Sequence, residues 1–317
     1  MREIARTLAS AQSVLMSLHR QPDGDSIGST LAIARALTAR GQDVLVVTPD
    51  PVPRAYDFLP GADGIVGWEA AEGRHFDLVA LFDCADERRC GAPHPLREYA
   101  PKVLNVDHHP SNDRYGDIVL VDDRAAASGE IAVRVLDALE VPLDRELALL
   151  LYVAIETDTG GFRYSSTTAA SHRLVARLLD TGLEPGEIFE KVYERQAVSG
   201  LRLLGAALQS LKVREDLSLA YVVLGQSDFA RAGAAPEDVE TLGIVDYARR
   251  LEGIEVGALL REESPEQVKL SLRAKGRIDV AELAKRLGGG GHVRAAGASI
   301  SGDLRHAEDV LLSLFAR

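Results

Sequence analysis

The fold is decided by one stretch near the start of the chain, SVLMSLHRQPDGDSIGSTLAIARALTA (residues 13–39). The apolar run at 13–18 predicts a strand, and the helical pattern at 27–39 is closed by Gly41, which suits a helix C-cap. Further strands are predicted at 43–48, 77–82, 102–106 and 118–121, and further helices at 126–139, 145–156, 169–180 and 185–195. This alternation favours an α/β fold, in which a parallel sheet carries helices on both faces.

The pattern changes in the last third of the chain, where strands and helices are mixed. Strands are predicted at 219–224, 256–261, 268–274 and 295–300, and helices at 201–211, 237–251, 280–287 and 304–314. A length of 317 residues also suits about two domains. We therefore expect a first domain at 1–189, a helical linker at 190–211 and a smaller α+β domain at 212–317.

Composition narrows the class of protein. A content of 46% hydrophobic and 26% charged residues is that of an ordinary globular protein. The net charge of −12 argues against binding of long duplex DNA. The longest apolar run, 147–155, has nine residues and is too short for a membrane span, which needs roughly 20. Two cysteines cannot form a disulfide framework, so we expect a cytoplasmic protein that does not enter the membrane.

Polar clusters of metal-ligand type follow three of the predicted strands. Because ligands of open α/β sheets bind beyond the carboxyl ends of the strands, these clusters can converge at one rim. Asp158, after the apolar helix 147–155, faces the negative end of the helix dipole, and a nearby cation would offset the cost. The candidate ligands are His19, Asp23, Asp25, Asp83, Asp107, His108 and Asp158.

The spacing of the first cluster has a physical logic of its own. In an extended segment Asp23 and Asp25 point the same way, and Gly24 lets the backbone approach closely. A helix starting at Ile27 would offer free N–H groups to an anion. The alternative is an ordinary turn, because Pro-Asp-Gly is a common turn sequence.

Seven candidate ligands are too many for one metal and suit two ions with a shared carboxylate. Imidazole and carboxylate donors without thiolate favour Mn²⁺, with Mg²⁺ or Co²⁺ as alternatives. Two ions about 3.5–4 Å apart are a common device for hydrolysing phosphate esters.

A second candidate site is GGGGHVRAAG (residues 288–297), which lies in a basic stretch. Glycine N–H groups can cradle an anion, and His292 and Arg294 could complete the pocket. Arg273, on a predicted strand of the same stretch, could reach the same place. The alternative is a flexible linker.

Five motifs, in order, resemble the DHH phosphoesterase superfamily, in the branch with a C-terminal DHHA1 domain and within it the oligoribonuclease and PAP phosphatase (NrnA-type) group. The motifs are His19 with PDGDSIGS (22–29), Asp83, Asp107-His108-His109, ETDTG (156–160) and GGGH (289–292) followed by AAG (295–297). The resemblance spans nearly the whole chain.

The resemblance implies a role for each position. His19 and Asp23 would hold one metal, Asp25, His108 and Asp158 the other, and Asp83 would bridge them. Asp107 would support the site or bind metal loosely, and His109 would contact the scissile phosphate or assist the leaving oxygen. The substrate-binding residues would be Arg273, Gly290, Gly291, His292 and Arg294.

The implied activity is metal-dependent hydrolysis of RNA of two to a few nucleotides to mononucleotides, and of 3′-phosphoadenosine 5′-phosphate (PAP) to AMP. Short single-stranded DNA is a further expected partner, and a homodimer is one option. The main alternative is a cyclic or linear dinucleotide phosphodiesterase. A RecJ-like exonuclease is normally longer, a manganese pyrophosphatase lacks the glycine-histidine signature, and a non-catalytic nucleotide sensor would use the metals structurally.

Overall fold

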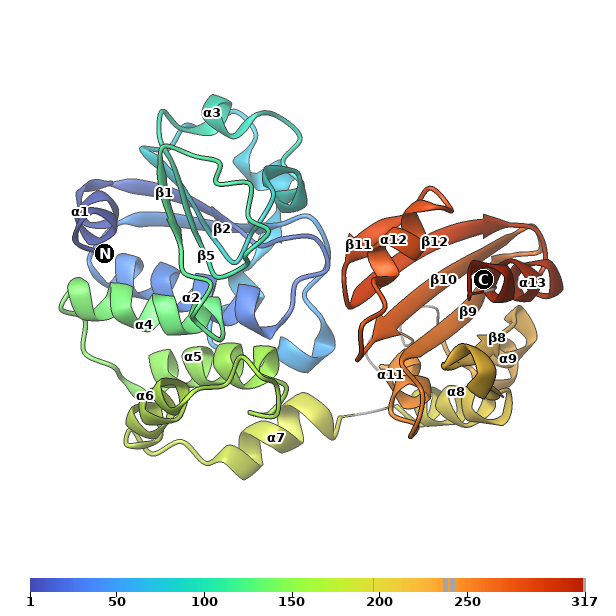
Figure 1. Ribbon diagram of the computed structural model, residues 1–317. Helices are drawn as coiled ribbons and strands as arrows, with labels where there is room; N and C mark the ends of the chain where they lie inside the picture. The colour runs from blue at the N-terminus through green and yellow to red at the C-terminus, as the bar shows by residue number, and fades with distance from the viewer. Residues whose placement is uncertain (196, 236–238, 240–242, 316–317) are drawn as a thin grey trace. The chain divides into compact units, whose positions relative to one another are not determined.

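The structure, a computed structural model, describes residues 1–195, 197–235, 239 and 243–315, without the side chain of residue 292. The chain forms two compact units, one at Met1–Arg195 and the other at 196–317. The first is an α/β unit and the second a mixed α+β unit (Figure 1). The predicted fold class is confirmed.

In its described residues the first unit contains a six-stranded sheet in which every pairing is parallel. The spatial order is β3-β2-β1-β4-β5-β6, so the direction of winding reverses between β1 and β4. The strands are β1 (Ser13–Ser17), β2 (Asp43–Thr48), β3 (Val66–Gly67), β4 (Leu78–Phe82), β5 (Val103–Asp107) and β6 (Ile118–Val121). In sheets of this kind the reversal point is where ligands bind.

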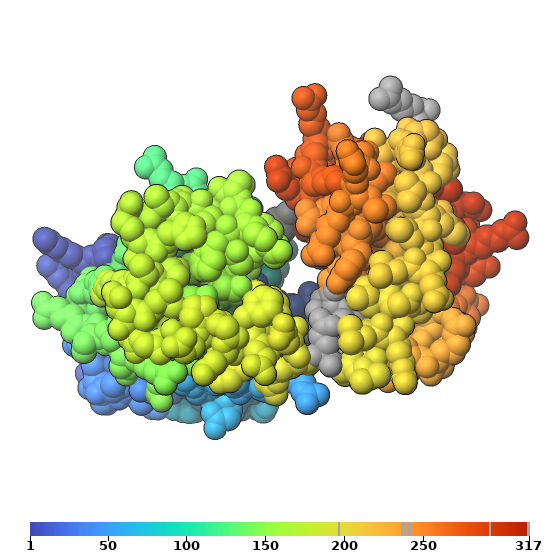
Figure 2. Space-filling model, turned by 90° about the horizontal axis from the view of Figure 1, so that it is seen from below, coloured from blue at the N-terminus to red at the C-terminus, as the bar shows by residue number. Residues whose placement is uncertain are grey.

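The two faces of this sheet are covered unequally. Val14 and Met16 of β1 pack on the face that carries the long helices, whereas Leu15 points to the other face. The long helices are α1 (Arg2–Ser10), α2 (Gly24–Ala39), α4 (Ser128–Ala138), α5 (Arg145–Asp158), α6 (Ala169–Leu179) and α7 (Pro185–Tyr193). The segment with α5, α6 and α7, yellow-green in Figure 2, forms much of the surface seen from below.

Short elements cover the other face because the connections there contain no long helix. Trp68 of the 3₁₀ helix η3 (Trp68–Ala71) and Tyr99 of α3 (Leu96–Tyr99) pack with Phe76 against Leu15. The prediction of helices on both faces is thus confirmed, with most of the helical layer on one side.

Glycine allows α2 and α5 to pack closely. A Cβ atom on Gly28 would lie 2.3 Å from the carbonyl oxygen of Leu150, and one on Gly24 would lie 2.3 Å from Oγ1 of Thr157. Such distances leave no room for a side chain. The close approach brings the start of α2 next to the end of α5, and these two helix ends carry Asp25 and Asp158.

The second unit is built on a mixed sheet with the order β11-β12-β10-β9-β8-β7. Only β8 and β9 pair in parallel among its described strands. The strands are β7 (Lys212–Arg214), β8 (Leu219–Leu224), β9 (Val256–Ser264), β10 (Gln267–Ala274), β11 (Gly290–His292) and β12 (Ala295–Ser301). Helices α12 (Val280–Lys285) and α13 (Leu304–Phe315) cover one face, and α8 (Val198–Gln209), α9 (Gln226–Ala232) and α11 (Ile244–Arg249) the other.

The helix expected within the linker is α8, and it belongs to the second unit. Leu203 and Ala207 of α8 are fully buried and pack with Val222 and Leu224 of β8. The division between units therefore falls before this helix and not after it. Of the helix expected at 237–251, α11 covers 244–249, and residues 237, 238 and 240–242 lie outside the described part. No helix among the described residues has the length and apolar character that a membrane crossing requires.

We expect Gly28→Ala to destabilise the first unit, because its Cβ would overlap the backbone of α5. Overpacking of this kind costs about 1–3 kcal/mol, and it would appear as a lower midpoint in urea denaturation. Gly186→Ala is the matched control, because open space surrounds Gly186 in α7. Equal stability of the two variants would contradict the role given to Gly28.

Candidate metal centre

The predicted ligands of the first unit come together at the carboxyl ends of β1, β4 and β5. His19 follows β1, Asp83 follows β4 directly, and Asp107 is the last residue of β5. Because β1 and β4 flank the point where the winding reverses, no helix crosses above their ends at that point. Among the described residues, donors there form two separate groups that could each hold a metal ion, and a third group, Asp83-Asp107-His108-His109, overlaps both.

The first group consists of His19, Asp23 and Asp83. Nε2 of His19 lies 3.7 Å from Oδ1 of Asp23 and 3.5 Å from Oδ2 of Asp83. Nδ1 of His19 lies 2.8 Å from the carbonyl oxygen of Arg20, to which it donates. The ring is therefore held with Nε2 towards the carboxylates, which is how a histidine ligand is normally oriented.

The second group consists of Asp25, His108 and Asp158. Nε2 of His108 lies 3.3 Å from Oδ2 of Asp158 and 3.8 Å from Oδ2 of Asp25. Nδ1 lies 3.3 Å from the carbonyl oxygen of Ala125, which fixes the proton on that side. Nε2 is buried and has no hydrogen-bond partner in the described part of the chain. A buried, unpartnered imidazole nitrogen among carboxylates fits a metal ligand.

Asp83 connects the groups. Its Oδ2 faces His19, and its Oδ1 lies 3.6 Å from both Nε2 of His108 and Nδ1 of His109. The backbone of Asp83 has φ of 59°, in the left-handed region that residues other than glycine seldom adopt. Strained backbone of this kind persists where the surrounding structure fixes it, often at functional sites. One carboxylate thus reaches both donor groups, as a bridging ligand must.

The N-terminus of α4 holds two of these carboxylates, which the sequence did not reveal. The backbone N–H groups of Ser128 and Gly129 donate to Oδ2 and Oδ1 of Asp25, at 2.6 and 2.8 Å. The Ser128 hydroxyl donates to Oδ1 of Asp83, at 3.1 Å. The sequence predicted a helix at this point, but nothing in it linked that helix to residues 103 positions earlier.

The first cluster adopts a different backbone from the one we expected. Helix α2 begins at Gly24 and not at Ile27, because Asp23 is its N-cap and accepts from the Ser26 N–H at 3.0 Å. Asp23 and Asp25 therefore do not share an extended segment, and the Ser26 N–H is not free for an anion. The two carboxylates still reach the centre from the cap and the first turn of the helix.

Burial and the crowding of carboxylates together determine the electrostatics of the centre. Burial and the charges of Asp83, Asp158 and Asp23 raise the pKa of Asp25 well above its usual range. Burial also raises the pKa of Asp158 to about 7; the charge of His108 opposes this rise, and the charges of Asp83 and Asp23 add to it. Divalent cations would relieve this repulsion.

Protonated imidazole partly compensates for this negative charge. Burial lowers the pKa of His19, but contacts with Asp23 and Asp83 outweigh it and raise that pKa to about 10. The protein without metal thus holds protons that a cation would displace.

Asp107 orients the two histidines that follow it. Its Oδ1 accepts from the backbone N–H of His108 at 2.7 Å and from Nδ1 of His109 at 2.8 Å. Its Oδ2 accepts from Asn112 at 2.6 Å. Burial lowers the pKa of His109, but the Asp107 hydrogen bond and the charges of Asp83, Asp107 and Asp158 raise it to about 9. The Asp107 oxygens are thus engaged in positioning, and Asn112 is a further supporting residue that the sequence did not indicate.

In the second unit, the strand register brings the expected substrate-binding positions together. Arg273 on β10 pairs with Ala295 on β12, and Ala295 pairs with position 292 on β11. The carbonyl oxygen of Arg294 accepts from the Ala274 N–H at 2.9 Å. Arg273, Arg294 and position 292 thus meet at one corner of the sheet, although the side chain of His292 lies outside the described part.

The glycine run is not a flexible linker throughout, because Gly290–His292 forms the edge strand β11. A Cβ on Gly289 would lie 2.2 Å from the carbonyl oxygen of Gly297, and one on Gly291 would lie 2.4 Å from that of Ala295. These two glycines allow the backbone to lie against β12. A Cβ on Gly290, in contrast, would meet open space. Of these three, Gly290 is the one whose backbone a ligand could approach.

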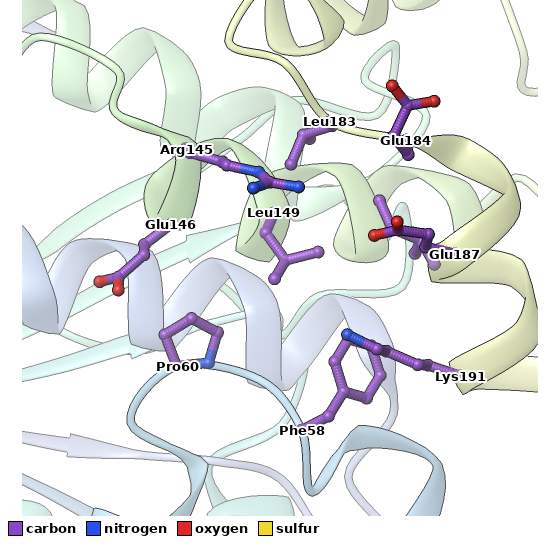
Figure 3. Close-up of a pocket in the computed structure, with 10 residues that line it drawn as sticks. Phe58, Pro60, Arg145, Glu146, Leu149, Leu183, Glu184, Glu187 and Lys191 are labelled. Atoms are coloured by element: carbon purple, nitrogen blue, oxygen red, sulfur yellow. The ribbon is translucent and has the colours of Figure 1, made fainter.

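A cavity of about 440 Å³ elsewhere in the first unit is separate from these donors. It lies between α5, α7 and the segment around Phe58, with Leu149 and Leu183 in its wall and Arg145 and Lys191 beside it (Figure 3). None of the predicted site residues lines it.

Comparison with known proteins identifies the family. Residues 13–155 match the DHH family, N-terminal domain, and residues 219–316 match the DHHA1 domain. The chain is 34% identical to a Thermus thermophilus protein named bifunctional oligoribonuclease and PAP phosphatase NrnA, over 98% of this chain and 92% of that protein. The chain belongs to the DHH family. A Bacillus subtilis protein of the same name is 28% identical over 94% of this chain and 92% of its own length.

Two solved structures share the fold of this chain. An exopolyphosphatase-related protein from Bacteroides fragilis superposes with a TM-score of 0.92 at 25% identity, covering 99% of this chain and 94% of that one. A Methanococcus jannaschii putative family II inorganic pyrophosphatase gives a TM-score of 0.51 at 16% identity, covering 95% of this chain and 98% of that one. The similarity to the pyrophosphatase, at 16% identity, shows a shared fold and nothing more.

We expect Mn²⁺ to bind to the DHH unit more tightly as the pH rises from 6 to 8. Below the raised pKa values of Asp158 and His19 these groups hold protons that the ion must displace. For each proton that the ion must displace, the affinity falls roughly tenfold for every pH unit below the pKa of that group. Isothermal titration calorimetry in buffers of different ionisation enthalpy measures both the affinity and the released protons. Binding independent of pH and without proton release would contradict the assignment.

Proposed function

We propose that this protein is a metal-dependent phosphoesterase that hydrolyses RNA of two to a few nucleotides to mononucleotides and converts PAP to AMP. The observation that carries the proposal is the pair of donor groups His19-Asp23-Asp83 and Asp25-His108-Asp158 at the rim of the first sheet. Oδ1 of Asp83, 3.6 Å from Nε2 of His108, connects the two groups. The names of the Thermus thermophilus and Bacillus subtilis relatives support the choice of substrates.

We propose the roles of the metal ligands from the two donor groups. His19 and Asp23 hold one divalent ion, Asp25, His108 and Asp158 the other, and Asp83 binds both. Oxygen and imidazole donors without thiolate favour Mn²⁺ over a structural zinc, with Mg²⁺ or Co²⁺ as alternatives. When bound, such a pair of ions neutralises the transferring phosphoryl group and lowers the pKa of the attacking water.

His109 is proposed to supply the proton for the leaving oxygen. Asp107 keeps a proton on Nδ1 and holds the ring, so that Nε2 can donate. Water adds to phosphorus and loses a proton to the solvent, the bond from phosphorus to the ribose oxygen breaks, and this oxygen takes a proton from His109. Asp107 therefore acts through His109, as a positioning residue.

The DHHA1 unit is proposed to bind the part of the substrate that does not react. Arg273 and Arg294 carry positive charge at one corner of its sheet, and Gly290 offers open backbone beside them. Together with His292 these residues suit a nucleotide phosphate. Short single-stranded DNA as a further substrate, a homodimer and a cytoplasmic location stay predictions.

The proposal is tested with a panel of substrates in the presence of Mn²⁺. The panel contains end-labelled RNAs of two to 24 nucleotides, PAP, cyclic di-AMP and pyrophosphate. We expect turnover of dinucleotides and PAP, with rates that fall as the RNA lengthens. Preferred hydrolysis of cyclic di-AMP would instead indicate a cyclic-dinucleotide phosphodiesterase. Preferred hydrolysis of the 24-nucleotide RNA would indicate a RecJ-like exonuclease.

Asp83→Asn should abolish both activities, because the amide removes the negative charge that the two ions share. We expect kcat to fall by at least about 10³-fold, while the fold measured by circular dichroism is kept. Asp63→Asn, at an exposed aspartate of the same unit, is the matched control. Activity of Asp83→Asn close to that of the control would refute the metal assignment.

Arg273→Ala and His292→Ala should mainly raise KM, because these residues are assigned to the part of the substrate that does not react. A lost charged contact to phosphate corresponds to about tenfold or more in KM. Lys285→Ala, whose ammonium pairs with Glu282 at 2.6 Å, serves as the control. A fall in kcat at unchanged KM would instead place these residues at the reaction itself.

A further inference from the structure

Arg89, which has no carboxylate partner among the described residues, lies against the candidate metal centre. Nη2 of Arg89 is 3.2 Å from Nδ1 of His19, and the side chain is half-buried. Within the described residues its guanidinium forms no salt bridge with an acidic side chain. Asp86, the nearby carboxylate, is already bound by Arg88 through Nε at 3.1 Å and Nη2 at 2.7 Å.

His19 cannot accept a hydrogen bond from Arg89 while it binds a metal. Its Nε2 faces Asp23 and Asp83, so Nδ1 carries the ring proton and donates it to the carbonyl oxygen of Arg20. In the contact between Arg89 and His19, both nitrogen atoms are then donors, so no hydrogen bond joins them. The N–H groups of the guanidinium are therefore left for another acceptor at the same place.

The fold holds this arginine in place from both sides. Arg89 lies in the 3₁₀ helix η4 (Glu87–Cys90), which Asp86 caps by accepting from the Arg88 N–H. The carbonyl oxygen of Arg89 accepts from the Arg20 N–H at 2.7 Å, which ties η4 to the loop that carries His19. The carbonyl of the next residue, Cys90, accepts from the indole of Trp68 at 2.8 Å. These contacts fix the backbone of Arg89, so less ordering is left for its side chain when it binds an anion.

We propose that Arg89 is a catalytic residue that binds the non-bridging oxygens of the reacting phosphate beside the metal ions. This assignment rests on the proposed function, since it takes the substrate to be a phosphate ester. A guanidinium presents paired N–H donors that match two phosphate oxygens, and its charge offsets the negative charge that builds up during transfer. Arg88 is exposed and paired with Asp86, so we assign it no role in binding the phosphate.

The first test compares Arg89→Ala with Arg88→Ala, a matched control on the neighbouring residue. Removal of one fixed donor at a transition state costs roughly 10²–10³-fold in kcat/KM. We expect a loss of that size in Arg89→Ala, a smaller loss in Arg89→Lys, partial rescue of Arg89→Ala by added guanidinium chloride, and little change in Arg88→Ala. The Mn²⁺ affinity of Arg89→Ala should equal or exceed that of the unmodified protein, because a cation is removed.

The second test measures binding of inorganic phosphate to the Mn²⁺-loaded protein by calorimetry, and so does not depend on turnover. Arg89→Ala should weaken phosphate binding at least tenfold and Arg88→Ala should not. Unchanged phosphate binding in Arg89→Ala, or a loss of Mn²⁺ affinity that matches the loss of activity, overturns the inference. If the unmodified protein hydrolyses neither dinucleotides nor PAP, the proposed function fails, while phosphate binding still decides the role of Arg89.

Discussion

The structure depends on a concentration of negative charge that protein groups alone balance only in part. The carboxylates of Asp23, Asp25, Asp83 and Asp158 gather around two imidazoles, and burial together with this crowding raises the pKa of Asp25 and of Asp158. Backbone N–H groups from α4 neutralise some of the charge on Asp25. Nε2 of His108 is buried and has no hydrogen-bond partner among the described residues. Divalent cations would both offset the negative charge and accept Nε2 of His108 as a ligand.

The scaffold of the first unit brings these charges together and keeps them there. Because Gly28 has no side chain, α2 and α5 approach closely enough for Asp25 and Asp158 to meet at one histidine. Asp83 turns out of β4 in the left-handed conformation, and its carboxylate is fixed by the hydroxyl of Ser128. The helix N-terminus that binds Asp25 also provides this hydroxyl. A single short segment therefore positions ligands from both donor groups.

The sequence predicted the elements of the fold and the acidic centre, because strands of alternating α/β type end in polar clusters that can be read directly. It placed the start of α2 three residues late, since a capping aspartate and a ligand aspartate look alike in sequence. The sequence also placed α8 in the linker, because its packing against Val222 depends on the tertiary structure and cannot be read from local sequence. Ser128, Asn112 and Arg89 were missed for a related reason: their partners lie elsewhere along the chain. Residue types and spacing identify ligands, but the groups that hold those ligands emerge from the fold.

The hydrogen bond between Asp25 and Ser128 has a consequence for biosynthesis. It spans 103 positions, and the His108 contact with Asp158 requires the last residue of α5. Until that residue has left the ribosome, a growing chain cannot complete the group Asp25-His108-Asp158. Completion of the two-group centre is thus a late event in synthesis, and products that end before Asp158 lack one of its two donor groups.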